Sequence, residues 1–308
     1  MRLGLRSFAL FLILLLGLSA CPAQTSDKSS KASEQIQSKA LKDLNLYGQD
    51  LLEKTPVYLG PQAKNPALRL AGNRLSCISC HLNGGKDSKA MGFMGISQRY
   101  PRYRALENRK ITLRERINSC FERSLNAKPL ADESRELKAL ESYIRQISQS
   151  TAPTETLAEL QLPPLKLLTR AAHPKAGEKL YQYHCSACHG KSGEGQLKNN
   201  ATPDQGYVFP PLWGQDSYGQ GSNLNRLTLA ARYIKANMPL GRPLLSAEEA
   251  YDIAAFINSH ERPQLKQAEK DFPDRSKKPA DVPYPPFADQ QSSERHRFGP
   301  FTDLKAPL

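Results

Sequence analysis

Two copies of one short motif constrain this chain more than any other feature. The segments 77–81 and 185–189 both follow the pattern C-x-x-C-H, which is the attachment signature of c-type haem. Two thiols form thioethers with the vinyl groups of one haem, and the adjacent histidine reaches the iron as the proximal ligand. A zinc site would need both cysteine pairs in one domain, and a redox dithiol does not explain the histidine after each pair. The sequence therefore predicts two covalently bound haem c groups, held by Cys77, Cys80, His81, Cys185, Cys188 and His189.

The first twenty residues predict an export signal. Two arginines precede an apolar run at 8–18, which is too short to span a bilayer. The run ends on Leu-Ser-Ala-Cys21, which resembles the lipobox of bacterial lipoproteins, where the cysteine becomes the lipid-modified first residue. Ordinary cleavage near Ala23 is the alternative. Both interpretations predict a periplasmic protein, and the first adds a membrane anchor through the lipid on Cys21 alone.

The length of 308 residues suits two domains after removal of the signal. Each motif is followed by a glycine-containing loop and by segments with helical periodicity, so we expect an all-α protein with two cytochrome c-like domains, each with one haem. The expected organisation is a signal peptide at 1–20, a flexible tether at 21–40, an N-terminal cytochrome c domain with the active-site haem at 41–150, a linker at 151–170, a C-terminal cytochrome c domain with the electron-transfer haem at 171–262, and an extended tail at 263–308. The proline-rich tail is expected to wrap over the domains rather than to form a third one.

Several helices can be predicted from apolar spacing and capping patterns. A serine followed three residues later by a glutamate, at 246–249, is a capping box. A proline-rich segment at 210–214 resembles the loop that packs on the haem edge in small monohaem cytochromes. The expected helices lie at 111–125 and 132–147 in the first domain and at 176–184, 224–236 and 246–258 in the second.

The second axial ligand of each iron must come from elsewhere in its domain, and methionine is common in electron carriers. Met238 lies 49 residues after His189, directly before a proline, and is the expected ligand of the second haem. In the first domain the methionines follow His81 too closely to reach the opposite haem face, whereas Cys120 lies 39 residues after it. A thiolate ligand would explain this otherwise unassigned cysteine. The alternatives are a buried apolar role for Cys120 and a packing role for Met238.

The chain carries a formal net charge of +13. An exported protein seldom meets nucleic acid, so the excess points to an anionic surface or substrate. The positive charge concentrates at 99–124, with seven arginines and one lysine against three glutamates. Arginine presents planar, forked donors that suit oxyanions. For any single arginine, pairing with a haem propionate or with Glu107, Glu115 or Glu122 is the alternative.

The sequence resembles the diheme c-type cytochromes that act as tetrathionate-forming thiosulfate dehydrogenases. The segment NSCFERSLN at 118–126, after an arginine-rich approach, resembles the region around the haem-ligating cysteine of that family, and NMPLG at 237–241 is similar to its second-haem ligand loop. The tail adds KKP at 277–279, PYPPFAD at 283–289, His296 and GPF at 299–301. The likeness covers about 41–301, and the cysteine segment and tail are its specific parts. Some family members have a lysine before the methionine, where this chain has Asn237, so a switch between lysine and methionine ligands is not expected.

The resemblance implies oxidation of two thiosulfate anions to tetrathionate, or the reverse. It implies that His81 and Cys120 bind the iron of the active-site haem. It implies that His189 and Met238 bind the iron of the electron-transfer haem. Electrons would pass from the first haem to the second and on to a cytochrome c or another periplasmic carrier. Cys120 would be ligand and reactant, and Ser124 with nearby arginines would hold the sulfonate groups; the candidates are Arg109, Arg116 and then Arg104. Two other functions stay open: a sulfur transferase that loads a carrier protein, and a diheme electron carrier with no substrate of its own.

Overall fold

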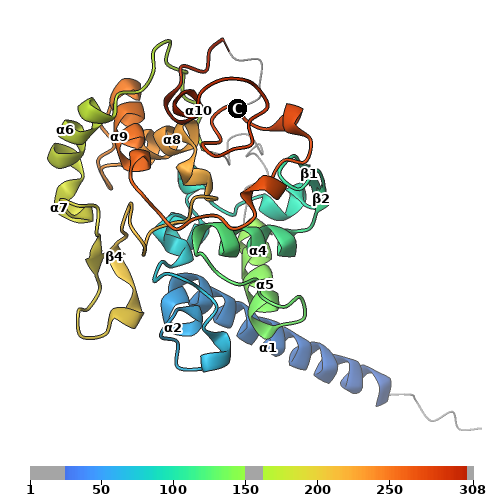
Figure 1. Ribbon diagram of the computed structural model, residues 1–308. Coiled ribbons are helices and arrows are strands. Elements are labelled where there is room, and N and C mark those ends of the chain that lie inside the picture. Colours follow the sequence, from blue (N-terminus) through green and yellow to red (C-terminus); the bar gives the residue numbers. More distant parts are fainter. Residues whose placement is uncertain (1–24, 150–161, 304–308) are drawn as a thin grey trace, which may run out of the picture. The chain divides into compact units, whose positions relative to one another are not determined.

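The structure describes residues 25–149 and 162–303. Helices make up most of the regular structure in both halves of this part of the chain, and its four strands form two short hairpins (Figure 1). In the computed structural model, β1 (Arg102–Arg104) pairs with β2 (Arg109–Ile111), with Tyr103 opposite Lys110. In the second half, β3 (Gln196–Leu197) pairs with β4 (Tyr207–Phe209). The all-α prediction is confirmed, with these hairpins as small additions.

The first half begins with helix α1 (Thr25–Glu53) and α2 (Thr55–Leu59). The predicted tether at 21–40 differs from the structure, because the part of it that is described, 25–40, belongs to α1. Short 3-10 turns and one helical turn then surround the first motif: η1 (Pro66–Leu68), η2 (Cys77–Ser79), α3 (Leu82–Gly85), η3 (Ser88–Ala90) and η4 (Ile96–Arg99). Between α2 and this motif, at 60–76, η1 is the only helical element. The predicted signal peptide, Cys21 and most of the linker, 150–161, lie outside the described residues.

The two predicted helices after the first motif are confirmed. Helix α4 (Leu113–Ser124) begins at a capping box in which Thr112 and Glu115 satisfy each other's backbone N–H groups. Helix α5 (Arg135–Gln149) buries one face, including Leu137, Leu140 and Ile144. The apolar residues recur at helical spacing, which places them on the side of α5 that faces the core.

The second half repeats this plan more regularly. Helix α6 (Pro174–His184) leads into α7 (Ser186–His189), and η5 (Pro203–Gln205) and η6 (Asn223–Asn225) precede helix α8 (Leu227–Asn237). Helix α9 (Ala247–Ser259) starts at the predicted capping box of Ser246 and Glu249. The predicted helices are confirmed to within a few residues at each end.

A glycine lets the first and last helices of each half cross at close range. A methyl group on Gly48 of α1 would lie 2.0 Å from the backbone oxygen of Ala139 in α5, and one on Gly177 of α6 would lie 1.8 Å from the backbone oxygen of Asp252 in α9. The same crossing in both halves is structural support for the repeat that the two motifs indicate. We call 41–150 domain one and 171–262 domain two.

The two domains belong to one compact unit that extends over 41–308, while 1–40 forms a separate unit. Polar contacts join the domains on several sides: Arg74 pairs with Asp216 at 2.7 Å, and the Asn73 side chain donates to the Ser217 carbonyl at 2.9 Å. The apolar core of domain one also includes Tyr218, Leu224 and Tyr233 from domain two. Domain one therefore does not complete its core alone.

The tail packs along both domains, as predicted, and its described part contains η7 (Ala268–Lys270), η8 (Arg275–Lys277) and α10 (Ser293–Phe298). Figure 1 shows it in red, running from the end of α9 toward the β1–β2 hairpin and back to α10. Its first part bonds to domain one, where the Phe272 N–H donates to the Leu106 carbonyl at 2.9 Å. Its later part bonds to domain two, where fully buried Asp281 pairs with Arg226 at 2.6 Å.

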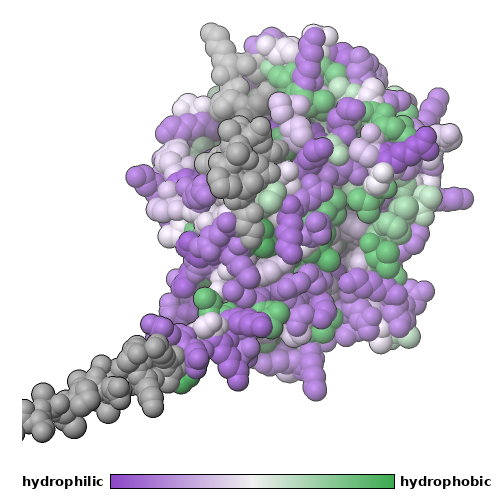
Figure 2. Space-filling view, turned by 180° about the vertical axis from the view of Figure 1, so that it is seen from behind, coloured by the Kyte–Doolittle hydropathy of each residue, from purple (hydrophilic) through white to green (hydrophobic). Residues whose placement is uncertain are grey.

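Hydrophilic side chains cover much of the face seen from behind, with apolar ones between them (Figure 2). Within 25–149 and 162–303, no helix is both long and apolar enough to cross a membrane.

The helix crossing in domain two yields a stability prediction. Gly177→Ala places a methyl group against the Asp252 backbone, and overpacking of this kind costs about 1–3 kcal/mol. We expect the thermal unfolding midpoint to fall by roughly 3–10 °C. Glu178→Ala, at an exposed position of the same helix, is the matched control and should leave the midpoint nearly unchanged. Equal midpoints for Gly177→Ala and the wild type would contradict the close crossing.

Candidate functional site

The first motif opens onto a cavity of about 350 Å³. Its apolar walls come from domain one, including Leu52, Phe93, Leu140 and Ile144, and from domain two, including Tyr218, Leu224 and Leu229. Five arginines also line it, which is unusual for an apolar cavity of this size: Arg99, Arg104, Arg116, Arg123 and Arg232. The cavity thus combines a surface for a flat apolar group with a strongly cationic side.

The histidine of the first motif is held in one tautomer. The His81 Nδ1 lies 2.6 Å from the Met91 carbonyl oxygen, so it must carry the proton and donate it. The other ring nitrogen, Nε2, is then left unprotonated and able to bind a metal, an arrangement that metal-bound histidines share. Burial lowers the His81 pKa to about 4, which keeps the imidazole neutral.

Helix α4 presents the predicted catalytic residues in one row. Arg116, Cys120 and Ser124 are spaced four residues apart and all line the first cavity, because residues at this spacing share one helix face. The charge of Cys120 in its thiolate form is the main cause that raises the pKa of Arg116. Among the described residues, no carboxylate lies within ion-pair distance of Arg116. A partly buried cation therefore lies one helical turn from the cysteine, with the charge of Glu107 nearby but without a carboxylate in ion-pair contact among the described residues.

The other two predicted arginines differ in position. Arg104 lines the cavity, pairs with Glu107 at 2.8 Å and donates to the Ser119 hydroxyl at 3.3 Å. Arg109 does not line it: its side chain is 57% exposed and pairs with Glu115 at 2.7 Å. Arg109 begins β2, directly opposite Arg104 in the hairpin, and its side chain extends to solvent, where it meets Glu115. For Arg104 and Arg109, pairing with a neighbouring glutamate is confirmed.

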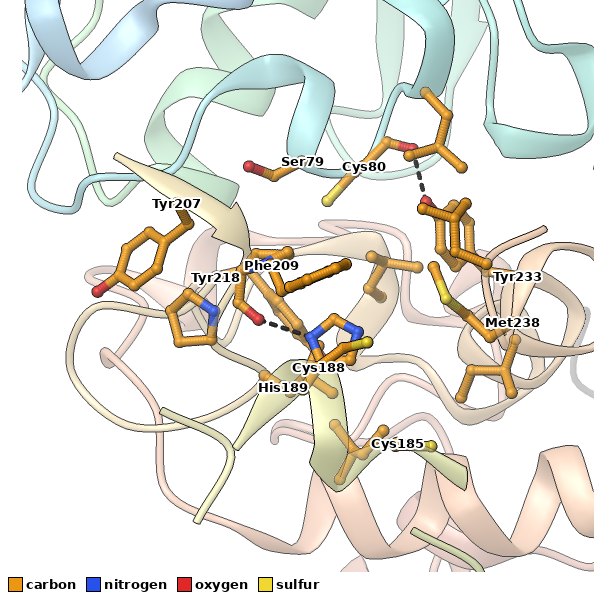
Figure 3. Close-up of a pocket in the computed structure, with 18 of the residues that line it drawn as sticks. Ser79, Cys80, Cys185, Cys188, His189, Tyr207, Phe209, Tyr218, Tyr233 and Met238 are labelled. Carbon is orange, nitrogen blue, oxygen red and sulfur yellow. Dashed lines mark hydrogen bonds between the residues drawn. The ribbon is translucent and has the colours of Figure 1, made fainter. Parts of the chain in front are cut away.

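The second cavity surrounds the second motif. The His189 Nδ1 donates to the Pro210 carbonyl at 2.8 Å, and burial lowers the pKa of this histidine. The predicted proline-rich loop therefore fixes the tautomer here, as the Met91 carbonyl does in domain one. Met238 caps the end of α8, and Figure 3 shows its side chain and His189 converging on the same space.

Helix α8 connects the two cavities. The Tyr233 hydroxyl donates to the Cys80 carbonyl at 3.0 Å, a bond drawn in Figure 3. At the end of α8, the Asn237 amide donates to the Lys89 carbonyl at 2.8 Å. Cys80 itself lines both cavities. Helix α8 therefore contacts the first motif through Tyr233 and the segment after that motif through Asn237.

The donor set fits two covalently attached haems. The motif cysteines are free thiols, and burial raises the pKa of Cys77 to about 11, of Cys80 to about 12 and of Cys185 to about 11. Each pair borders an apolar cavity that also contains a neutral histidine with its Nδ1 proton engaged. Thiols for thioethers, an available imidazole nitrogen and apolar walls are what a haem c group requires.

Several cavity residues were missed by sequence reasoning. Gly221, Ser222, Asn223 and Arg232 of domain two line the first cavity. No local pattern marks them, because only the packing of one domain against the other brings them there. Arg123 lies inside the predicted arginine cluster but was not singled out; its partner, Asp271, is in the tail.

Comparisons with known proteins agree with this geometry. Residues 70–152 match the family model described as SoxA/TsdA, cytochrome c domain, and 172–257 match the one described as cytochrome c oxidase, cbb3-type, subunit III. The thiosulfate dehydrogenase of Stutzerimonas stutzeri is 33% identical over 247 residues, which cover 79% of this chain and 78% of that protein. The chain belongs to the thiosulfate dehydrogenase family. The enzyme of that name from Allochromatium vinosum is 41% identical over 201 residues, covering 64% of this chain and 73% of that one.

A solved structure extends the likeness to the fold. The thiosulfate dehydrogenase (TsdBA) of Marichromatium purpuratum, in its as-isolated form, matches with a TM-score of 0.66 and 34% identity over 74% of this chain. This chain spans 48% of the length of that one. The two cytochrome c domains and two covalent haem c groups predicted from the motifs are thereby confirmed.

Proposed function

We propose that this protein oxidises two thiosulfate anions to tetrathionate in the first cavity and passes the electrons to an external acceptor. The observation that carries the proposal is the position of Cys120 and Arg116, one helical turn apart on α4, in the cavity of the first motif. Among the described residues, no carboxylate lies within ion-pair distance of Arg116. A diheme electron carrier needs neither a cationic cavity nor a cysteine facing it. The family's thiosulfate dehydrogenases support the choice of substrate.

Each haem would be held by the residues of its own motif, Cys77, Cys80 and His81 in domain one and Cys185, Cys188 and His189 in domain two. Cys120 and Met238 are the proposed second ligands, and their places in the two cavities support this. The chemistry that the haems supply when bound is the acceptance of electrons and their transfer from the first cavity to the second. The contact of Tyr233 with Cys80 gives the two cavities a short connection for that transfer.

In the proposed mechanism Cys120 is the covalent catalyst. Its thiolate forms a bond to the outer sulfur of one thiosulfate, giving a cysteine–S–SO3⁻ adduct and releasing two electrons. The outer sulfur of a second thiosulfate then attacks the sulfur bound to Cys120. This forms the central S–S bond of tetrathionate and returns the cysteine to its thiolate. The same steps in reverse would reduce tetrathionate.

The arginines would make it possible for the anions to approach. Two dianions and a thiolate repel one another, and this repulsion is strong in a cavity with apolar walls. Arg116 adds a fixed positive charge at Cys120, and Arg104 supplies further N–H donors from β1. Ser124, one turn beyond Cys120 on α4, adds a hydroxyl for a sulfonate oxygen. Preorganised donors of this kind stabilise developing charge without reorganisation.

The test of the function is thiosulfate-dependent reduction of ferricyanide, with tetrathionate quantified, for wild type and for Cys120→Ser with both haems attached. We expect turnover in the wild type and its loss in the variant, because the variant lacks the sulfur that forms the adduct. The absorption spectrum should change for one haem only, since Met238 is untouched. If the wild type neither oxidises thiosulfate nor reduces tetrathionate, the remaining functions are an electron carrier and a sulfur transferase that requires partner proteins.

Variants of two arginines test whether a positive charge acts on the substrate in the cavity or only adds to the charge of the surface. Arg116→Gln should lower kcat/KM for thiosulfate by about 10²-fold, the usual cost of losing one preorganised donor to a developing anion. Arg109→Gln removes an equal charge that is exposed and paired with Glu115, so its kcat/KM should stay within about twofold of the wild type. Similar losses in both variants would assign the effect to net charge instead of to the cavity.

The proposed location is the periplasm, with attachment to a membrane through a lipid on Cys21. The support is the apolar run that ends on Leu-Ser-Ala-Cys21. A cytochrome c or a similar periplasmic carrier is the proposed acceptor. Cys21→Ala should move the protein from the membrane fraction to the soluble periplasmic fraction, and unchanged membrane association of this variant would refute the lipid anchor.

A further inference from the structure

The wall of the first cavity that domain two supplies has no role in the mechanism so far. Gly221, Ser222 and Asn223 form this wall and lie opposite the end of α4. A methyl group on the nearby Gly219 would lie 2.7 Å from the Arg123 carbonyl oxygen. Domain two therefore approaches the backbone of α4 closely, directly beside Ser124.

Two serines from different domains meet at this junction. The Ser124 hydroxyl donates to the Ser222 hydroxyl oxygen at 3.2 Å, and the Leu224 N–H donates to the same oxygen at 3.3 Å. The Ser222 oxygen thus accepts two bonds, while its own O–H has no acceptor among the described residues. A hydroxyl in this situation at a cavity wall is a donor available to an anion.

Arg123 adds N–H donors beside the serines. It also lines the cavity, and a methyl group on Gly221 would lie 3.1 Å from its Nη1. The guanidinium is fixed by the tail: Asp271 accepts from both terminal nitrogens, one of them at 2.8 Å, and the Tyr284 hydroxyl donates to the same carboxylate at 2.7 Å. Asp271 and Tyr284 thus fix one side of the Arg123 guanidinium, while the side toward Gly221 borders the cavity.

We propose that Ser222 and Arg123, with Ser124 fixing the Ser222 hydroxyl, form a second sulfonate subsite, which holds the thiosulfate that attacks the Cys120 adduct. This rests on the proposed function, because two thiosulfate anions must meet there. Arg116 lies one helical turn before Cys120 on α4 and Ser124 one turn after it. One thiosulfate bound beside Arg116 and a second bound beside Ser124 would each direct the outer sulfur toward Cys120, one from each side of the cysteine along α4.

The two anion sites differ in charge, and this difference suits the order of events. Asp271, which is 5% exposed, offsets the charge of Arg123, whereas Arg116 has no carboxylate partner among the described residues. The second subsite therefore offers hydrogen bonds with little net charge. It binds the attacking thiosulfate less tightly than Arg116 binds the first, and so one end of tetrathionate is released readily.

The decisive experiment separates the two half-reactions. Oxidised protein is given one equivalent of thiosulfate, the adduct on Cys120 is quantified by mass spectrometry, and excess isotopically labelled thiosulfate is then added to discharge it. For Ser222→Ala we expect adduct formation at the wild-type rate and discharge slowed by about tenfold or more, the effect of losing a hydrogen bond to a charged group. Ser222→Thr, which keeps the hydroxyl, should recover most of the discharge rate.

Ser192→Ala, at an exposed position outside both cavities, is the matched control and should leave both half-reactions unchanged. Equal slowing of the two half-reactions in Ser222→Ala, or no slowing of either, would overturn the second subsite.

A binding measurement keeps the subsite testable if the covalent mechanism fails. Methanesulfonate carries the sulfonate group but no reactive sulfur, and its binding to the haem-loaded protein is measured by calorimetry. We expect Ser222→Ala to weaken one binding event by about tenfold. Absence of an adduct in the wild type would refute the covalent step alone. Equal methanesulfonate binding by wild type and Ser222→Ala, or no binding by either, would refute the subsite.

Discussion

Five residues line both haem cavities, and the rest of the arrangement depends on this shared wall: Leu75, Ser76, Cys80, Tyr218 and Leu224. Two separate cytochrome domains would each close their own apolar cavity. Here the side chains of one domain complete the cavity of the other, so the two motifs must lie close together. The Tyr233 hydroxyl on the Cys80 carbonyl and the Arg74–Asp216 pair fix that relation with polar contacts at 3.0 and 2.7 Å.

This wall also lets the two cavities differ in character, which supports the proposed separation of thiosulfate chemistry from electron transfer. The first cavity contains the arginines and Cys120, whereas the lining of the second contains no arginine or lysine among the described residues and includes Met238. A cationic, cysteine-containing cavity suits an anionic substrate, and an apolar cavity with a methionine suits a carrier. The division follows from which helix faces each cavity. Helix α4 supplies a charged face to the first, and α8 brings tyrosine, isoleucine and methionine to the second.

Local sequence was sufficient for most of the fold and for part of the site. The motifs predicted two haem domains, and capping residues such as Thr112 and Ser246 located helix starts because a cap is a local interaction. The structure adds that Arg116, Cys120 and Ser124 share one face of α4. Arg109 does not line the cavity, because its side chain extends from β2 to solvent. Ser222 and Asp271 were missed because packing between distant segments brings them to the cavity, and such packing leaves no local pattern.

The tail affects the order in which the first cavity is assembled during folding. Arg123 is held by Asp271, a partner 148 residues further along the chain. Helix α4 and the first motif precede that partner by a long stretch of chain, so the carboxylate that fixes Arg123 is in place only once the tail has packed. Contacts of such long sequence separation form late, because the intervening chain must first be ordered. The reactive cavity is therefore completed among the last steps of folding, after both motifs have been made.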